Sequence, residues 1–196
     1  MKNEEAKRKT TSSLIKIARK HFAARGYFDV SLEQIAEEGN VTRGAAYHHF
    51  KSKKGLFLAV LESVQQNVAA YVLKEALKSE EPWQQLILGN VGFVKGANAK
   101  ENRRILLVDA PAVLGWEDWR KFDQENAVRV MLDHIEALKR DGYLRDDVDT
   151  KFMAYSISGA TNELALNYSQ YKEAACYDLV VSTISHFVSG FRREKL

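Results

Sequence analysis

One short stretch of the chain carries side chains with the chemistry needed to contact a nucleic acid. Thr42, Arg43 and His48 can donate or accept hydrogen bonds at base edges, and a guanidinium suits the two acceptors of a guanine. Gly44 would let a backbone approach closely, and Ala45 could meet the methyl group of a thymine. These contacts require that the five residues share the open face of one rigid element.

Two short helices joined by a tight turn would position them. Ser31 followed by Gln34 is a capping box, which predicts that the first helix begins there. Its buried face repeats at helical spacing and consists of Leu32, Ile35 and Ala36. Gly39 is predicted to end this helix in a left-handed conformation, and Thr42 is the predicted N-cap of the second helix.

The second helix would bury Ala46 and Phe50, which are four residues apart. Tyr47, His49 and Lys51 then lie toward the phosphates. A purely structural role is the alternative for the aromatic residues; we adopt it for Phe50 but not for Tyr47, whose hydroxyl needs a polar partner. The pattern therefore predicts a helix-turn-helix.

The surrounding block resembles the DNA-binding domain of the TetR family of bacterial regulators. The residues that carry the resemblance are Gly26, Ser31, Ile35, Ala36, Gly39, Val41, Gly44, Tyr47, Phe50, Ser52, Lys53 and Leu56. The resemblance implies that Ser31 and Lys53 bind phosphates, which suits a helix N-terminus and an ammonium group. The predicted DNA-binding set is Ser31, Thr42, Arg43, Gly44, Ala45, Tyr47, His48, His49, Lys51 and Lys53.

Charge is distributed unevenly along the chain. Of 29 Lys and Arg residues and 26 Asp and Glu residues, the first 54 positions hold 12 and 6, which leaves 17 and 20 for the remainder. The net charge of +3 thus conceals a basic N-terminal segment. Such asymmetry is expected where one domain meets phosphates and another does not. A solvated charged surface is the alternative when the motif is left aside.

The whole chain is predicted to be all-α, with about nine helices. A polar, frayed leader over residues 1–9, with an arm that touches DNA as the alternative, precedes them. The expected helices cover residues 10–25, the two helices of the motif, and 52–78, 82–98, 103–109, 116–140, 151–169 and 172–193. Residues 1–51 would form a three-helix DNA-binding head, and residues 52–196 a helical ligand-binding and dimerisation domain. The helix over 52–78 would link the two rigidly.

A hydrophobic pocket among the later helices is the default small-molecule site. Its predicted lining is Trp83, Phe93, Leu107, Trp116, Trp119, Phe122, Met131, His134, Tyr155 and Asn162. A core role is the alternative for any one aromatic side chain. The glycines at 89, 92 and 96 would permit either close helix packing or room for a ligand.

Apolar residues cover more than one face of the last two helices, which predicts a partner beyond their own core. The family resemblance implies that this partner is the same helix pair of a second subunit. The predicted dimerisation residues are Phe152, Ile157, Ala160, Leu164, Leu179, Ile184, Phe187 and Phe191. The alternative is that both faces are internal.

Other classes of protein receive no support from the sequence. No uninterrupted apolar run of the length of a membrane span is present, the N-terminus lacks the apolar core of a secretion signal, and one cysteine, Cys176, suits a reducing cytosol. Adjacent His48 and His49 point about 100° apart on a helix and do not converge on a metal. We found no nucleophile motif, phosphate loop or metal cluster, so we predict no enzyme activity, no cofactor and no metal.

Together these features predict a cytoplasmic, homodimeric, TetR-like transcriptional regulator, most simply a repressor. It would bind a palindromic double-stranded operator and be released by an unknown small hydrophobic or aromatic effector, with no membrane partner. The alternative is a DNA-binding regulator controlled by a protein partner, or one with no small-molecule effector.

Overall fold

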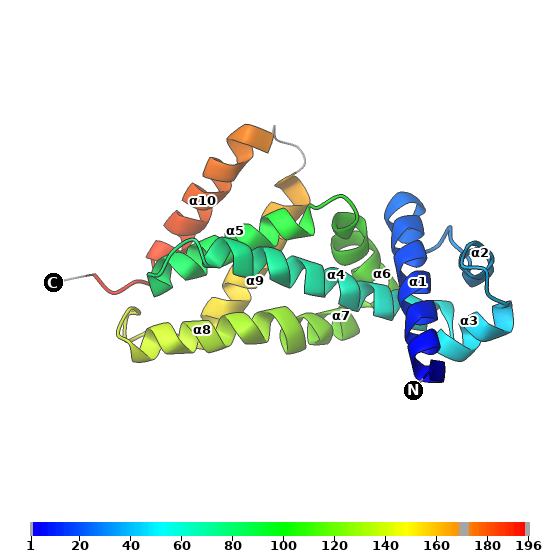
Figure 1. The fold of residues 1–196 in the computed structure, drawn as a ribbon. Helices are drawn as coiled ribbons and strands as arrows, with labels where there is room; N and C mark the ends of the chain where they lie inside the picture. The colour runs from blue at the N-terminus through cyan, green and yellow to red at the C-terminus, as the bar shows by residue number, and fades with distance from the viewer. Residues whose placement is uncertain (1, 169–172, 195–196) are drawn as a thin grey trace. The chain divides into compact units, whose positions relative to one another are not determined.

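The computed structural model describes residues 2–168 and 173–194, and every regular element in this part of the chain is helical (Figure 1). The all-α prediction is confirmed. The elements are α1 (Lys2–Arg25), α2 (Leu32–Glu38), α3 (Arg43–Phe50), α4 (Lys53–Ala76), α5 (Pro82–Ala97), the π-helix η1 (Arg104–Asp109), α6 (Ala110–Leu114), α7 (Trp116–Asp123), the π-helix η2 (Gln124–Val128), α8 (Arg129–Arg140), α9 (Thr150–Asn167) and α10 (Glu173–Ser189).

The chain forms two compact units that are not contiguous in sequence. Unit 1 comprises residues 1–66 and 100–115, and unit 2 comprises residues 67–99 and 116–196. The boundary at Gln66 falls inside α4, so this helix belongs to both units. This division is geometric, whereas the sequence-based division at residue 51 concerns function and stays a prediction.

Helix α1 begins eight residues earlier than the sequence predicted, at Lys2. Its first turn contains Glu4 and Glu5, which interact favourably with the positive end of the helix dipole. Glu5 also pairs with Lys9 one turn later, at 3.2 Å. The prediction of a frayed leader is therefore wrong for the described residues, because acidic residues and an i,i+4 pair support a helix there.

Residues 100–115 pack inside unit 1. The buried carboxylate of Asp109 accepts a hydrogen bond from the backbone N–H of Tyr27 at 2.9 Å, and Arg104 donates to the carbonyl of Ala24 at 3.4 Å. Burial raises the pKa of Asp109, although the Tyr27 N–H and the Arg104 charge oppose that shift. These contacts fasten the segment to the turn that follows α1.

Two helix boundaries in the middle of the chain differ from the prediction. We expected the helix from Arg103 to stop at Asp109, but η1 continues into α6 as far as Leu114. Pro111 lies in the first turn of α6, directly after the π-helical turn. Similarly, the helix expected from Trp116 is divided by the π-helical turn η2, a type of irregularity that propensity does not predict.

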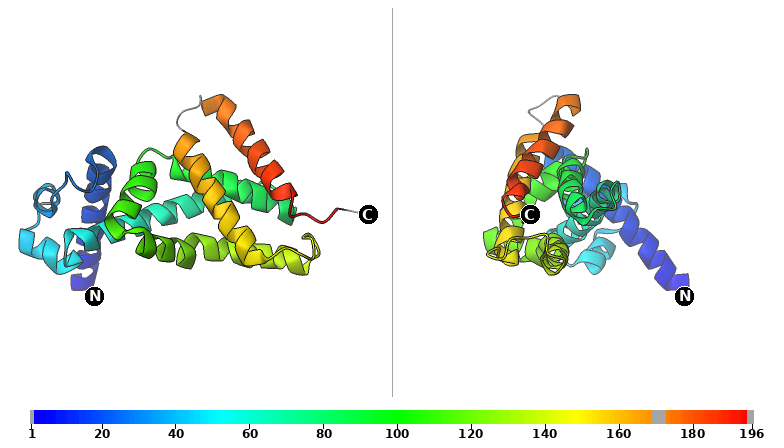
Figure 2. Two further views of the ribbon diagram at one scale, coloured as in Figure 1. Left: turned by 180° about the vertical axis from the view of Figure 1, so that it is seen from behind. Right: turned by 90° about the vertical axis from the view of Figure 1, so that its left-hand side faces the viewer.

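In unit 2, α5 packs closely on the second half of α4, and its glycines allow this contact (Figures 1 and 2). A Cβ at Gly92 would lie 2.6 Å from the Tyr71 carbonyl oxygen and 2.8 Å from Val72 Cα, and a Cβ at Gly96 would lie 2.9 Å from Tyr71 Cβ. Of the two sequence interpretations, close packing therefore accounts for Gly92 and Gly96.

We expect Gly92→Ala to destabilise unit 2, because the added methyl group meets backbone atoms that cannot rotate away. Overpacking of this kind costs about 1–3 kcal/mol. Thermal unfolding followed by circular dichroism would measure the loss. Gly159→Ala is the control, since a Cβ there meets nothing within 4 Å; an equal stability of the two variants would contradict the prediction.

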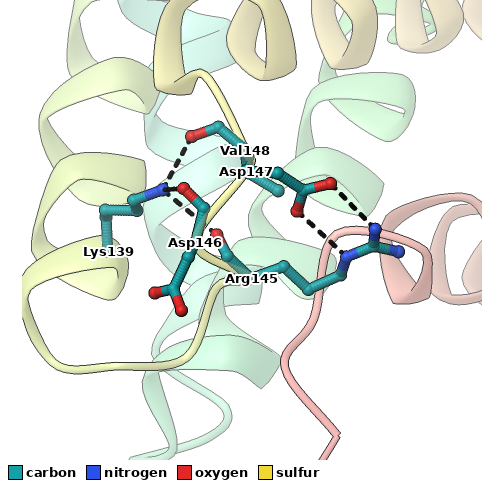
Figure 3. A network of polar contacts seen from close by, with 5 residues as sticks. All are labelled: Lys139, Arg145, Asp146, Asp147 and Val148. Carbon is teal, nitrogen blue, oxygen red and sulfur yellow. Dashed lines mark hydrogen bonds and ion pairs between the residues drawn. The ribbon is translucent and has the colours of Figure 1, made fainter.

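The loop between α8 and α9 is closed by one lysine (Figure 3). The Lys139 ammonium donates to the carbonyl oxygens of Arg145, Asp146 and Val148, at 3.1, 2.9 and 2.8 Å. Arg145 in turn makes two hydrogen bonds to the Asp147 carboxylate, at 3.1 and 2.9 Å. The network fixes the turn that leads to Asp149, whose side chain caps α9 by accepting from the Phe152 N–H.

Helix α4 is long and apolar enough to cross a membrane by length and composition alone. This finding qualifies the expectation that the sequence contains no apolar stretch as long as a membrane span. The core helix of a soluble protein passes the same test. Five apolar residues in the first half of α4 are fully buried within unit 1: Leu56, Phe57, Val60, Leu61 and Val64.

Candidate nucleic-acid interface

The capping interactions of the helix-turn-helix are those that the sequence predicted. Ser31 Oγ accepts a hydrogen bond from the Gln34 N–H, and Gln34 Oε1 accepts one from the Ser31 N–H, both at 3.1 Å. Thr42 Oγ1 accepts from the Ala45 N–H at 3.1 Å and so begins α3. Each cap therefore fixes the first turn of its own helix.

The turn between α2 and α3 differs from the prediction in one residue. Gly39 has φ −77°, and the left-handed residue is Asn40, with φ 51°. Asparagine tolerates this region better than most residues. Gly39 is instead constrained by space, since a Cβ there would lie 2.6 Å from Leu14 Cδ2.

Helix α3 buries one face and exposes the other. Ala46 and Phe50 are buried, as expected, and Ala45 and His49 are half-buried. The exposed members of the predicted DNA-binding set on or next to α3 are Thr42, Arg43, Gly44, Tyr47, His48 and Lys51. Hydrogen-bonding and cationic groups are thereby concentrated on the open face of one helix.

Arg43 has two partners in the free protein. Its Nε lies 2.9 Å from Glu33 Oε1, at the start of α2, and its guanidinium lies 5.4 Å from the centre of the Tyr47 ring. Both charged side chains are largely exposed, so the ion pair contributes little to stability. The pair and the ring nevertheless hold the guanidinium on the open side of α3.

His49 is joined to α1. Its Nδ1 lies 3.0 Å from Thr11 Oγ1, and its ring is half-buried. Burial lowers the pKa of His49, and the positive charges of Lys7 and His48 lower it further. The lowered pKa favours the neutral form of the His49 ring, which carries no positive charge to attract a phosphate.

Lys53 points into unit 1. Its ammonium donates to the carbonyl oxygens of Tyr27 and Val30, at 3.0 and 2.9 Å, and lies 4.2 Å from the centre of the Tyr27 ring. These contacts hold the turn that leads to Ser31. The neighbouring Lys54 is exposed and was not in the predicted set, because no cap or apolar spacing distinguishes it in the sequence.

Nine of the ten predicted ligand-binding residues belong to unit 2, and one belongs to unit 1. Trp83 is buried at the start of α5, where His134 lies 3.0 Å from the carbonyl of Pro82. Trp116 and Trp119 lie on α7 with ring centres 5.1 Å apart, and Trp116 is 62% exposed. Leu107 belongs to unit 1, and the remaining members lie in unit 2: Phe93, Phe122, Met131, Tyr155 and Asn162.

A groove of about 400 Å³ lies between α9 and α10. Six of the eight predicted dimerisation residues line it: Ile157, Ala160, Leu164, Leu179, Ile184 and Phe187. Ile157 and Ile184 are buried, whereas Leu179 and Phe187 are exposed by 49% and 42%. Phe152 lies elsewhere on α9 and is 74% exposed, and Phe191 packs on Phe187 with ring centres 6.0 Å apart.

Two family models together match most of the chain. The model for bacterial regulatory proteins of the tetR family matches residues 14–60, and a tetracyclin repressor-like C-terminal domain matches residues 83–191. The chain belongs to the TetR family. It is thus a DNA-binding transcriptional regulator of the helix-turn-helix class, as the sequence predicted.

Individual TetR-family relatives agree with this assignment. The transposon Tn10 TetC protein of Escherichia coli is 24% identical over 172 residues, which cover 88% of this chain and 86% of TetC. The transcriptional regulator SrpR of Pseudomonas putida is 33% identical over 98 residues, or 50% of this chain and 46% of SrpR. A crystal structure of a TetR-family regulator from Pectobacterium atrosepticum is 28% identical and covers 98% of both chains with a TM-score of 0.75.

The part of this TetR-family chain that the structure describes contains no group of three or more His, Cys, Asp or Glu residues able to hold a metal ion. His48 and His49 have ring centres 6.2 Å apart and are tilted by 73°, as neighbours on a helix surface. The side chain of Cys176 lies outside the described part of the structure.

Proposed function

We propose that the protein is a cytoplasmic homodimeric repressor that binds a palindromic operator and is released by a small hydrophobic or aromatic effector. Each subunit would place α3 in the major groove, with half-sites roughly 34–36 Å apart. The observation that carries this proposal is the exposed, hydrogen-bonding face of α3 on a fully capped helix-turn-helix.

In this proposal Thr42, Arg43 and His48 read base edges, while Gly44 and Ala45 allow close approach. Tyr47 and Lys51 contact backbone phosphates. A further backbone phosphate binds at the N-terminus of α2, at Ser31. His49 and Lys53 act differently from the other members of the set. Their contacts with Thr11 and with the turn after α1 support a role in positioning α3 and α2.

Arg43→Ala tests the assignment of base readout. We expect operator affinity to fall about 30-fold or more, since a bidentate base contact contributes about 1–3 kcal/mol and each of the two subunits loses one. Selection of bound duplexes from a random pool should show relaxed preference at one position of each half-site. Lys20→Ala, an exposed cation on α1, is the control. An unchanged base preference in Arg43→Ala would remove this residue from direct readout.

The dimer is proposed to form through α9 and α10. Its support is the apolar groove between these helices, in which Leu179 and Phe187 are exposed in the single chain. Pairing of two such faces would remove both side chains from water. The domain assignment follows from the same proposal: residues 1–51 bind DNA, and residues 52–196 bind the effector and dimerise.

The effector is proposed to bind among the aromatic residues of unit 2. The 62% exposure of Trp116 favours, as a second candidate, a regulator controlled by a protein partner, because a large exposed apolar side chain can be covered by another polypeptide. Native mass spectrometry of the dimer purified from its bacterial host separates the two. A small-molecule mass retained on the folded dimer supports an effector, whereas a bound polypeptide supports the second candidate.

A further inference from the structure

A second basic surface lies on unit 1, outside the predicted DNA-binding set. It is a groove of about 600 Å³ between one face of α1 and the middle of α4. We call it the α1 groove, and its charged lining consists of Glu4, Lys7, Arg8, Lys16 and Arg19. Four of these five side chains are cationic, and the hydroxyls of Thr11, Ser12 and Ser63 lie among them.

Most of this positive charge is not neutralised by acids. Arg19, at the far end of the groove, pairs with Glu101 at 3.2 Å and donates to Asn102 at 2.7 Å. In the part of the chain that the structure describes, no ion pair joins Lys7, Arg8 or Lys16 to a carboxylate. All three are exposed, so their charge is available to an approaching anion.

The α1 groove is continuous with the proposed DNA-binding surface. Thr11 lines the groove and lies 3.0 Å from His49, on the last turn of α3. Lys7 is four residues before Thr11, on the same side of α1, and its charge acts on His49. The end of the α1 groove that contains Lys7 and Thr11 therefore borders α3, the helix that is proposed to enter the major groove.

The spacing of the cations indicates an extended partner. Lys7 and Lys16 are nine residues apart, or about 13 Å along a helix. A compact anion such as inorganic phosphate would need cations that converge on one point, whereas a nucleic-acid backbone presents phosphates in a row.

We propose that the α1 groove binds backbone phosphates of duplex DNA beside the base pairs that α3 reads, chiefly through Lys7 and Arg8. This inference rests on the proposed function and extends its DNA-binding surface to α1. Such contacts are independent of sequence, so they can be tested without knowing the operator.

The test is the salt dependence of binding to a mixed-sequence duplex of about 30 base pairs, measured by fluorescence anisotropy between 50 and 200 mM salt. Each phosphate contact contributes about 0.9 to the slope of log Kobs against log salt. Lys7→Ala with Arg8→Ala removes two contacts from each subunit of the proposed dimer and should lower the slope by about 3.6. The affinity of the double variant relative to wild type should therefore change about 150-fold across this fourfold salt range.

The matched control is Lys9→Ala with Lys20→Ala, which removes the same charge from exposed positions of α1 outside the groove. A wild-type slope in the control and a reduced slope in the groove variant support the inference. Equal slopes in the two double variants overturn it, even if the wild type binds DNA well. Binding of inorganic phosphate that is lost in the groove variant, with an unchanged DNA slope, overturns it in favour of a compact anion.

A wild-type protein that shows no salt-dependent binding to any duplex overturns the proposed function and this inference together. A wild-type protein that binds, but with a slope insensitive to Lys7 and Arg8, overturns only the inference. The two failures are therefore distinguishable in one titration series.

Discussion

Leu179→Glu should convert the proposed dimer into monomers and weaken binding to an operator duplex by about 100-fold or more. Leu179 is 49% exposed and lines the groove between α9 and α10, so a glutamate there is solvated in the single chain. At a self-complementary interface the same carboxylate would be buried unpaired and would face its own copy. Loss of the dimer removes the effective concentration that couples two half-sites, a factor of about 10²–10⁴.

Light scattering after gel filtration measures the molecular mass of each variant in solution. Fluorescence anisotropy measures its affinity for the operator duplex. The control is Val130→Glu on α8, a 69% exposed apolar residue that does not line the groove. It should remain dimeric and bind DNA as the wild type does. A Leu179→Glu protein that stays dimeric would show that the subunits associate through another surface.

Glu75→Ala should cause the largest loss of stability of any single change proposed here. Glu75 is 4% exposed, and its carboxylate accepts from Lys78 at 2.6 Å, Lys95 at 2.8 Å and the Tyr177 hydroxyl at 3.3 Å. The Lys95 ammonium also lies 4.5 Å from the centre of the Tyr177 ring. Removing the carboxylate leaves two ammonium groups facing each other, which costs about 3 kcal/mol, the lower end of the range for a buried pair, because the Lys78 and Lys95 side chains are 48% and 33% exposed and water screens part of their charge.

Chemical denaturation measures this change, and Glu62→Ala, an exposed position on the same helix, is the control. Burial alone would raise the pKa of Glu75, but the hydrogen bonds and charges of Lys78 and Lys95 outweigh it and hold the pKa below 4.5. A depressed acid stabilises the fold above its unfolded pKa and loses that contribution as the pH falls through its folded pKa. The difference in the free energy of unfolding between wild type and Glu75→Ala should therefore become smaller below pH 4.5. A difference that does not change with pH would show that packing of the Glu75 side chain dominates its contribution.

The helix-turn-helix could be predicted from sequence because its determinants are local. Each N-cap joins residues that are three positions apart: Ser31 with Gln34, and Thr42 with Ala45. Caps at this spacing can be recognised in the sequence without any knowledge of tertiary contacts. The turn could be misassigned for the same reason: Gly39 and Asn40 are both plausible left-handed residues. Contact with Leu14, which is distant in sequence, explains why the glycine is there.

Contacts between distant residues could not be predicted from spacing. The inward position of Lys53 depends on the carbonyls of Tyr27 and Val30, and the docking of residues 100–115 depends on Asp109 reaching the Tyr27 N–H. For the predicted ligand site, the aromatic-rich composition could not indicate which side chains are buried. Trp83 and Trp116 have similar chemistry, yet one is 2% exposed and the other 62%.

The discontinuous sequence of unit 1 has a consequence for the order of events during synthesis. A ribosome makes the first 66 residues of this unit, then 33 residues of unit 2, and only then the segment 100–115. The acceptor for the Tyr27 N–H, Asp109, therefore leaves the ribosome long after the helix-turn-helix that it supports. The nascent head therefore lacks this hydrogen bond during that interval, and we expect a fragment that ends at Gln66 to lack it as well.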